Sequence, residues 1–278
     1  STPCPCDENR RYGGNTSCVV LDVPGGEPIL FDLGTGLRFY GVAEPCTEVP
    51  FRGTALLSHL HWDHVQGLPF FPPLHCQGSR LDVYGPGEEG RSLEDSFNAF
   101  MNPPFFPICI RDLPGQITFH DATSGSFDVG PARVTVGEVP HVGATFGYRV
   151  DWEGVSVAYV SDHQQPVDDP RRVVDSVLEL VDGVDLLIHD AQFTPEEFAE
   201  RPDWGHCTVD YALEVAHQAT AGELVLFHHD PAHCDGTIDG LLAAATDRAA
   251  GLDVGSVSAA AEGRTVHLSP TSPLAARS

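Results

Sequence analysis

The chain contains the stretch Thr54-Ala-Leu-Leu-Ser-His59-Leu-His61-Trp-Asp63-His64. Its apolar beginning, residues 55–57, is typical of a buried strand. His59 and His61 lie two residues apart, so an extended backbone directs both imidazoles to the same side. Asp63 and His64 follow in the turn, where they can face a second ion. Because imidazole and carboxylate suit zinc, manganese and iron, this stretch predicts a metal site at the end of a strand.

Three further apolar strands end in a potential metal ligand. Residues 133–139 precede His141, residues 155–160 precede Asp162, and residues 223–227 precede His228. Strand ends that converge on one sheet edge form a site even when they are far apart in sequence. Together with the first stretch they supply five imidazoles and two carboxylates. This set suffices for two ions, with one carboxylate bridging them.

The order of expected elements favours one α/β domain over residues 1–268, with helices outside packed sheets. The chain has 278 residues, 41% of them hydrophobic, and no linker or repeat divides it. Residues 33–36 are expected to form a tight turn, and residues 269–278 a disordered tail. We expect strands at 18–23, 28–32, 55–57, 81–84, 116–120, 133–139, 146–150, 155–160, 184–188, 223–227 and 264–268, and helices at 92–101, 171–181, 208–219 and 238–250, with one more starting at 194.

The net charge of −25 argues against long RNA or DNA as a partner, because an acidic surface repels polyanions. All fifteen basic residues are arginines. No apolar run approaches the roughly 18 residues of a membrane span, and no signal segment opens the chain. We therefore expect a cytoplasmic protein that does not enter a membrane. The oligomeric state stays open, with a homodimer as one option.

The eight cysteines are too sparse for a disulfide scaffold. Cys4 and Cys6 are the only close pair. They are either reduced thiols in a loop or part of a structural zinc site with Cys234 or His233. The spacing does not supply four evident ligands for such a site.

The ordered set H-x-H-x-D-H, His, Asp, His resembles that of the metallo-β-lactamase superfamily over nearly the whole chain. The resemblance implies a four-layer αββα sandwich and a hydrolase with two divalent ions, zinc first and manganese or iron as alternatives. It also implies a ligand set for each ion. One ion would be held by His59, His61 and His141, the other by Asp63, His64 and His228, with Asp162 bridging.

Other segments are similar to one branch of that superfamily, tRNase Z and the phosphoribosyl cyclic phosphodiesterase-like group. They are Arg11-Tyr-Gly-Gly-Asn-Thr-Ser-Cys18, Pro140-His141 through Gly147-Tyr-Arg-Val150, Leu187-Ile-His189-Asp-Ala-Gln-Phe193, Gly205-His206-Cys-Thr208 and Leu226-Phe-His-His-Asp-Pro231. The family pattern opens with a strand that has no counterpart before Ser1. The arm with which tRNase Z grips tRNA would lie in the interval 150–161, which has room only for a hairpin. Asp190 stands where tRNase Z has Glu.

The resemblance implies a phosphodiesterase that acts on a small cyclic phosphodiester through a hydroxide bridging the metals. The alternatives are a glyoxalase II-like thioesterase or lactonase, a tRNase Z-like endoribonuclease, and a metal-binding module without turnover. By family position, Asp63 and His206 are the catalytic candidates. His206 is a general acid or phosphate contact, or else a histidine at a helix start without a catalytic role.

Several residues are candidates for support around the metals and the substrate. Asp32 is either an ordinary turn acid or the partner that orients a ligand histidine. His189 and Asp190 are expected to support the ligands from behind. Aromatic side chains are expected to cover a base or sugar of the substrate, namely Phe70, Phe71 and Phe105.

Overall fold

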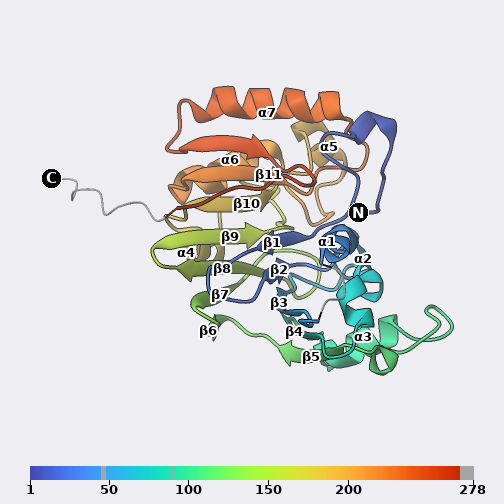
Figure 1. Ribbon diagram of the computed structural model, residues 1–278. Helices are drawn as coiled ribbons and strands as arrows, with labels where there is room; N and C mark the ends of the chain where they lie inside the picture. Colours follow the sequence, from blue (N-terminus) through green and yellow to red (C-terminus); the bar gives the residue numbers. More distant parts are fainter. Residues whose placement is uncertain (45–47, 89, 270–278) are drawn as a thin grey trace.

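A computed structural model describes residues 1–44, 48–88 and 90–269. Two mixed β-sheets face each other, and helices cover their outer faces (Figure 1). The first sheet has the order β1-β2-β3-β4-β5, and the second has the order β12-β11-β10-β9-β8-β7-β6. The first described strand begins at Val19; residues 1–18 contain one short 3-10 turn, Asp7–Asn9.

The strands of the first sheet run parallel from β2 to β5, and β1 pairs antiparallel to β2. In the second sheet β9 to β12 are parallel, whereas β6 to β9 form antiparallel pairs. The bounds are β1 (Val19–Leu21), β2 (Ile29–Phe31), β3 (Arg52–Leu56), β4 (Arg80–Gly85), β5 (Gln116–Asp121), β6 (Gly125–Val129), β7 (Ala132–Glu138), β8 (Phe146–Trp152), β9 (Val155–Val160), β10 (Leu186–Asp190), β11 (Glu223–Phe227) and β12 (Ser256–Ala259).

Hydroxyl side chains define where three of the helices begin. Ser92, Thr194 and Thr208 each accept a hydrogen bond from the backbone N–H three residues further on. The helices are α1 (Gly36–Ala43), α2 (Trp62–Val65), α3 (Leu93–Phe100), α4 (Asp175–Val181), α5 (Pro195–Glu200), α6 (Val209–Gln218) and α7 (Asp235–Ala249), with further 3-10 turns at Leu68–Phe70, Pro72–His75 and Ile110–Asp112.

Three apolar clusters hold the layers together. The middle cluster fills the space between the sheets and includes Phe31, Tyr148 and Tyr159. A second cluster packs α4, α6 and α7 on the outer face of the second sheet. A third packs α1, α2 and α3 on the outer face of the first sheet. This arrangement confirms the predicted four-layer αββα sandwich. A single domain over residues 1–268 stays a prediction.

The structure corrects several predicted elements. Residues 264–268 are not a strand; Val266 and Leu268 pack against the middle cluster without joining a sheet. β6 and β12 were not predicted, because both are edge strands with few large apolar residues. Residues 33–36 lead into α1, a helix hidden in the sequence by Gly36 and Gly41, which have low helix propensity.

Two helices begin at other residues than predicted: α4 begins at Asp175 and α7 at Asp235. The predicted tail, apart from Ser269, lies outside the described residues. No helix in the described ranges has the length and apolar character needed to cross a bilayer.

Candidate metal centre

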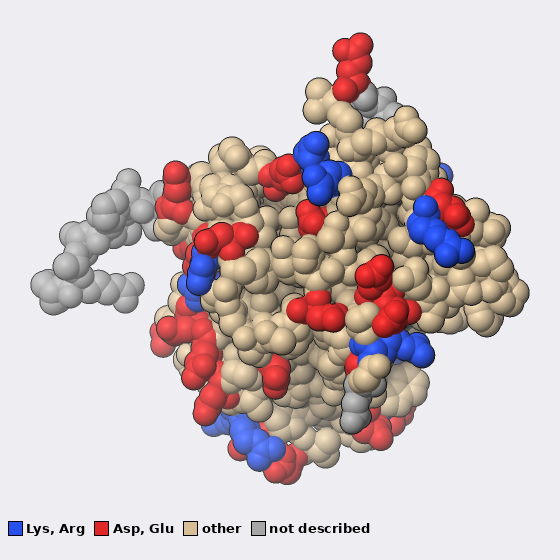
Figure 2. All heavy atoms as spheres, turned by 90° about the horizontal axis from the view of Figure 1, so that it is seen from below, with Lys and Arg blue, Asp and Glu red and all other residues tan. Residues whose placement is uncertain are grey.

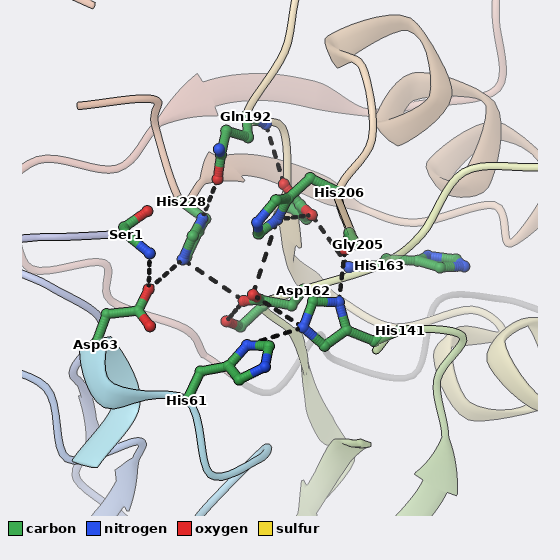
Figure 3. A network of polar contacts seen from close by, with 12 residues as sticks. Ser1, His61, Asp63, His141, Asp162, His163, Gln192, Gly205, His206 and His228 are labelled. Atoms are coloured by element: carbon green, nitrogen blue, oxygen red, sulfur yellow. Dashed lines mark hydrogen bonds and ion pairs between the residues drawn. The ribbon is translucent and has the colours of Figure 1, made fainter. Parts of the chain in front are cut away.

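The parallel strands deliver their following residues to one edge of the sandwich. His59 follows β3, Asp162 follows β9, and His228 follows β11. The short helix α2 then places Asp63 and His64 beside them. The predicted residues thus converge from both sheets (Figure 3). Three groups have potential ligand atoms within 4.8 Å of one another: His59, His61, His141 and Asp162; Asp63, His64 and His228; and Asp162, His206 and His228.

Asp162 lies between the two sets of imidazoles. Its Oδ1 is 3.3 Å from His64 Nε2 and 3.6 Å from His228 Nε2. Its Oδ2 is 3.7 Å from both His59 Nε2 and His141 Nε2. One carboxylate therefore faces both predicted ligand sets with different oxygens, which is the geometry expected of a shared ligand.

The chemistry of the pocket fits divalent cations. The Nε2 atoms of His59 and His64 are buried and have no hydrogen-bond partner among the described residues. Buried polar atoms normally have a partner, so these two nitrogens indicate a missing one. Burial lowers the pKa values of His59, His61 and His141, which favours neutral imidazoles with a free lone pair. The His/Asp clusters are consistent with a dinuclear metal site.

Asp63 is also suited to this site. Burial alone would raise the pKa of its carboxyl group, but interactions with the nearby imidazoles of His228 and His64 overcome that effect and hold the pKa below its usual value. Its Oδ2 lies 3.2 Å from His228 Nε2. Asp63 is therefore a carboxylate, able to hold a cation.

The outer nitrogens of three imidazoles are held by fixed acceptors. His64 Nδ1 donates to Asp32 Oδ2, His141 Nδ1 to the carbonyl of Gly205, and His228 Nδ1 to Gln192 Oε1, each at 2.7 Å. A proton fixed on Nδ1 leaves the Nε2 lone pair for a cation. Only glycine fits at position 205, because the Cβ of any other residue would lie 2.2 Å from the ring of His141.

Asp32 is more than a turn acid in this structure. It is fully buried and accepts from the N–H and hydroxyl of Ser58, the hydroxyl of Tyr159 and Nδ1 of His64, at 2.7 to 2.9 Å. Ser58 Oγ in turn lies 3.0 Å from Nδ1 of His59. These contacts support the interpretation that Asp32 orients ligand histidines.

We expect Asp32→Asn to weaken metal binding by about 10–100-fold, because an amide cannot accept all four of these hydrogen bonds. Tyr159→Phe is the matched control, since it removes one donor to Asp32 and leaves the bond to His64 intact. Zinc affinity is measured by competition with a chelator. If both variants bind zinc equally, Asp32 does not act through His64.

His206 lies against the same centre and is held by Asp190. Asp190 Oδ2 is 3.0 Å from His206 Nδ1, and the His206 ring stacks on His228 with centroids 4.9 Å apart. Burial would lower the pKa of His206, but the carboxylates of Asp190 and Asp162 outweigh it and raise this pKa. The hydrogen bonds that His206 makes to described residues leave its Nε2 without a partner. Nδ1 also lies 3.8 Å from Asp162 Oδ2, so a protonated His206 keeps a second N–H, on Nε2, that no described residue accepts.

The structure supports some of the other predicted supporting residues less well. His189 bonds to His163 Nδ1 and to the carbonyl of Asp190, and none of its hydrogen bonds reaches the proposed ligands. The aromatic cover is wrong for Phe71, which is fully buried in the cluster under the first sheet. Phe70 and Phe105 are exposed, but Trp62, exposed at 73%, is the aromatic residue next to the site in sequence.

A structural zinc site at the amino-terminal cysteines finds no support. No group of three or more metal-capable side chains in the described part of the chain includes Cys4 or Cys6. Cys4, Cys6 and Cys234 are free thiols, and His233 Nε2 pairs with Glu197 at 2.9 Å. The observations agree with the alternative of thiols in a loop.

Sequence analysis missed Gln192 and Ser58, whose side chains contact predicted ligands. Both stand one or two residues from a predicted site residue at a strand end. This position beside a strand end was the feature of the sequence that could have identified them. Whether a short polar side chain at such a position reaches a ligand depends on the turn, which the pattern of residues does not define.

The layered fold and the paired His/Asp groups at its edge define the class of protein, a metal-dependent hydrolase. Residues 29–229 match the family model described as the beta-lactamase superfamily domain, so the chain belongs to the metallo-β-lactamase superfamily. Its sequence is similar to proteins named ribonuclease Z, and it shares its fold with a diphosphatase from the PhnP family and with a human tRNase Z.

Three comparisons illustrate these relationships. The chain is 29% identical over 259 residues to the ribonuclease Z of Natronomonas pharaonis, covering 77% of this chain and 81% of the relative. The metallo-beta-lactamase fold protein YhfI from Bacillus subtilis superposes with a TM-score of 0.69 at 20% identity, covering 94% of this chain and 92% of YhfI. A diphosphatase from the PhnP family gives a TM-score of 0.62 at 20% identity, covering 90% and 82%.

Proposed function

We propose that this protein is a metal-dependent phosphodiesterase that hydrolyses a small phosphodiester, with a cyclic one as the first choice. The observation that carries the proposal is the position of Asp162, a buried carboxylate between two sets of imidazoles. In each set one buried inner nitrogen, on His59 or His64, lacks a hydrogen-bond partner among the described residues. Such a pair of sites suits a phosphodiester, which needs its charge neutralised on more than one oxygen.

The proposed ligands divide between two ions as the family pattern implies. When bound, the ions would supply Lewis-acid stabilisation of phosphoryl oxygens and lower the pKa of water toward neutrality. Zinc is the first choice, and manganese or iron also suits this donor set. His59, His61 and His141 would hold one ion, Asp63, His64 and His228 the other, and Asp162 would contact both.

His206 is the proposed proton donor to the leaving oxygen. Asp190 holds Nδ1, so a proton on the opposite nitrogen, Nε2, is available to the departing alkoxide. Asp190 also accepts from the backbone N–H groups of His163 and Gln192, which fixes the carboxylate itself. The imidazole is thereby oriented before any substrate arrives.

The fold around the site supports a small substrate. Trp152 and Val155 pair at the end of the β8–β9 hairpin, so residues 150–161 form two strands and a tight turn without an arm. On the face seen in Figure 2 acidic side chains are widespread, and the arginines lie in small separate groups. With a net charge of −25, a long polyanion meets repulsion over much of this surface.

The organic part of such a substrate is proposed to lie in a cavity of about 390 Å³ beside α2, although none of the proposed ligands lines it. Leu60 and Trp62, the two neighbours of His61 in sequence, line it, and Arg91 and Phe100 line it further along. Trp62 offers an aromatic face for a base or sugar. Arg91 and Glu88 place one positive and one negative charge in the same lining, so the cavity as a whole favours no further anionic group.

We expect Trp62→Ala to raise KM for a nucleotide or aryl diester about tenfold, with kcat little changed, because stacking on an aromatic face contributes about 1–3 kcal/mol. Phe105→Ala is the matched control: Phe105 is 85% exposed and does not line this cavity. Steady-state kinetics on one diester separate the two constants. Equal KM values in both variants would place the organic group elsewhere.

Precursor tRNA processing is the second candidate, favoured by the 25–29% identity to several proteins named ribonuclease Z. A panel of cyclic nucleotides, ribose cyclic phosphates, aryl diesters, thioesters, lactones and precursor tRNA distinguishes the candidates on zinc- or manganese-loaded protein. We expect hydrolysis of small diesters and no trimming of tRNA at comparable enzyme levels. Site-specific removal of a tRNA 3′ trailer would overturn this proposal. Turnover of thioesters or lactones alone would favour a glyoxalase II-like enzyme, and zinc binding with no turnover a binding module.

A further inference from the structure

The segment that follows β10 contacts both buried histidines at the second-sheet side of the centre. The carboxylate of Asp190 accepts from His206, and two residues later Gln192 Oε1 lies 2.7 Å from His228 Nδ1 (Figure 3). Gln192 is 5% exposed, and its backbone N–H donates to Asp190 Oδ1 at 3.0 Å. Its side chain is therefore held in place from both ends.

A third residue defines which way the Gln192 amide faces. Gln192 Nε2 lies 3.5 Å from Asp230 Oδ2, which is also 3.3 Å from Nη1 of Arg201. The other oxygen of Asp230 accepts from the backbone N–H of Ala232 at 2.8 Å. A carboxylate accepts hydrogen bonds and does not donate them. The NH₂ group of Gln192 must then face Asp230, and its carbonyl oxygen must face His228.

We propose that Gln192 is a positioning residue that keeps the Nδ1 proton on His228 and so reserves Nε2 for a cation. An amide oxygen can only accept, so Nδ1 of His228 has to donate. Nε2 then faces Asp63 Oδ2 at 3.2 Å and Asp162 Oδ1 at 3.6 Å, where the proposed second ion would lie. The inference rests on the proposed function only in taking His228 as a ligand.

The backbone of His228 makes this support necessary. Its φ is 55°, in the left-handed region that non-glycine residues seldom adopt. Such a conformation persists where the surroundings determine it. The hydrogen bond to Gln192 and the stacking of the ring on His206 are contacts that hold the His228 side chain in this conformation. The sequence Asp190-Ala-Gln192 thus places a hydrogen-bond acceptor at Nδ1 of two imidazoles from one strand end.

Two variants test the proposal with zinc as the probe. Gln192→Met keeps the length of the side chain and removes the acceptor, and we expect zinc affinity to fall about 10–100-fold. Gln192→Glu restores an acceptor for Nδ1, and its zinc affinity should lie nearer to the wild-type value. Competition with a chelator measures both. Methionine and glutamate variants that bind zinc as tightly as each other would overturn the proposal.

Asp230→Asn gives a sharper result, because it changes neither His228 nor Gln192 itself. The N–H of Ala232 keeps the oxygen of the introduced amide in place, so the new NH₂ group faces Gln192 and turns its amide over. Gln192 would then donate to His228 Nδ1, and the proton of the neutral ring would move to Nε2. We expect zinc affinity to fall as far as in Gln192→Met.

The Nδ1 proton is read directly from ¹H–¹⁵N correlation spectra of the zinc-loaded protein, with His228→Ala to assign the signal. A hydrogen-bonded Nδ1–H of His228 in the wild type that is lost in Asp230→Asn is the expected pair of results. An unchanged Nδ1–H signal in Asp230→Asn would refute the amide-orientation argument. These measurements need no substrate. If the protein binds zinc but hydrolyses no diester, the proposed function is wrong, whereas the proposed role of Gln192 is unaffected.

Discussion

Asp162→Ala is expected to weaken both metal sites and to lower hydrolysis of a small diester by on the order of a thousandfold or more, as when a preorganised charge is removed from an active site. Its two oxygens face different imidazole sets, at 3.3 to 3.7 Å. Loss of this carboxylate should therefore weaken both sites together, whereas loss of a single imidazole should weaken one.

Elemental analysis of wild-type protein after zinc reconstitution should give two ions per chain, and the variant should give at most one. Asp203→Ala is the matched control, because Asp203 is exposed and the chemical change is the same. An Asp162→Ala protein with two ions and full turnover would show that the ligand sets share no carboxylate.

His206→Ala should lower kcat by about a hundredfold or more while both ions stay bound, if its Nε2 protonates the leaving oxygen. The loss should shrink for a diester with an acidic aryl leaving group, which departs without a proton. Asp190→Asn keeps the imidazole and weakens its orientation, so it should show a smaller loss with the same dependence on leaving group.

Two other results would assign His206 differently. An equal loss for alkyl and aryl leaving groups would make it a contact to the phosphate. Loss of an ion from His206→Ala would make it a ligand, since its ring lies with Asp162 and His228 in one of the three metal-capable groups. Metal content measured beside the kinetics separates these roles.

The centre could be predicted because its residues sit at strand ends, where topology brings distant positions together. His59, Asp162 and His228 each follow an apolar run, and parallel pairing then aligns their ends. The layers were predictable for a related reason, since alternating strands and helices must cover both faces of a sheet.

Features that depend on tertiary contacts were not predictable. The role of Asp32 was open until Ser58, Tyr159 and His64 were seen to surround it. Phe71 looks like a surface aromatic in its proline-rich segment, yet it fills the core beneath α1. Edge strand β12 contains small and polar residues and relies on β11 for its pairing.

The two sheets contribute unequal sides of the candidate centre. His59, His61, Asp63 and His64 come from the first sheet, and His141, Asp162 and His228 come from the second. The contacts between the sheets are otherwise largely apolar. A cation held by residues of both sheets is thus a reversible cross-link across the sandwich. By mass action it stabilises the folded chain by an amount that grows with the logarithm of free metal concentration. The metal supply around this protein would then regulate its lifetime as well as its chemistry.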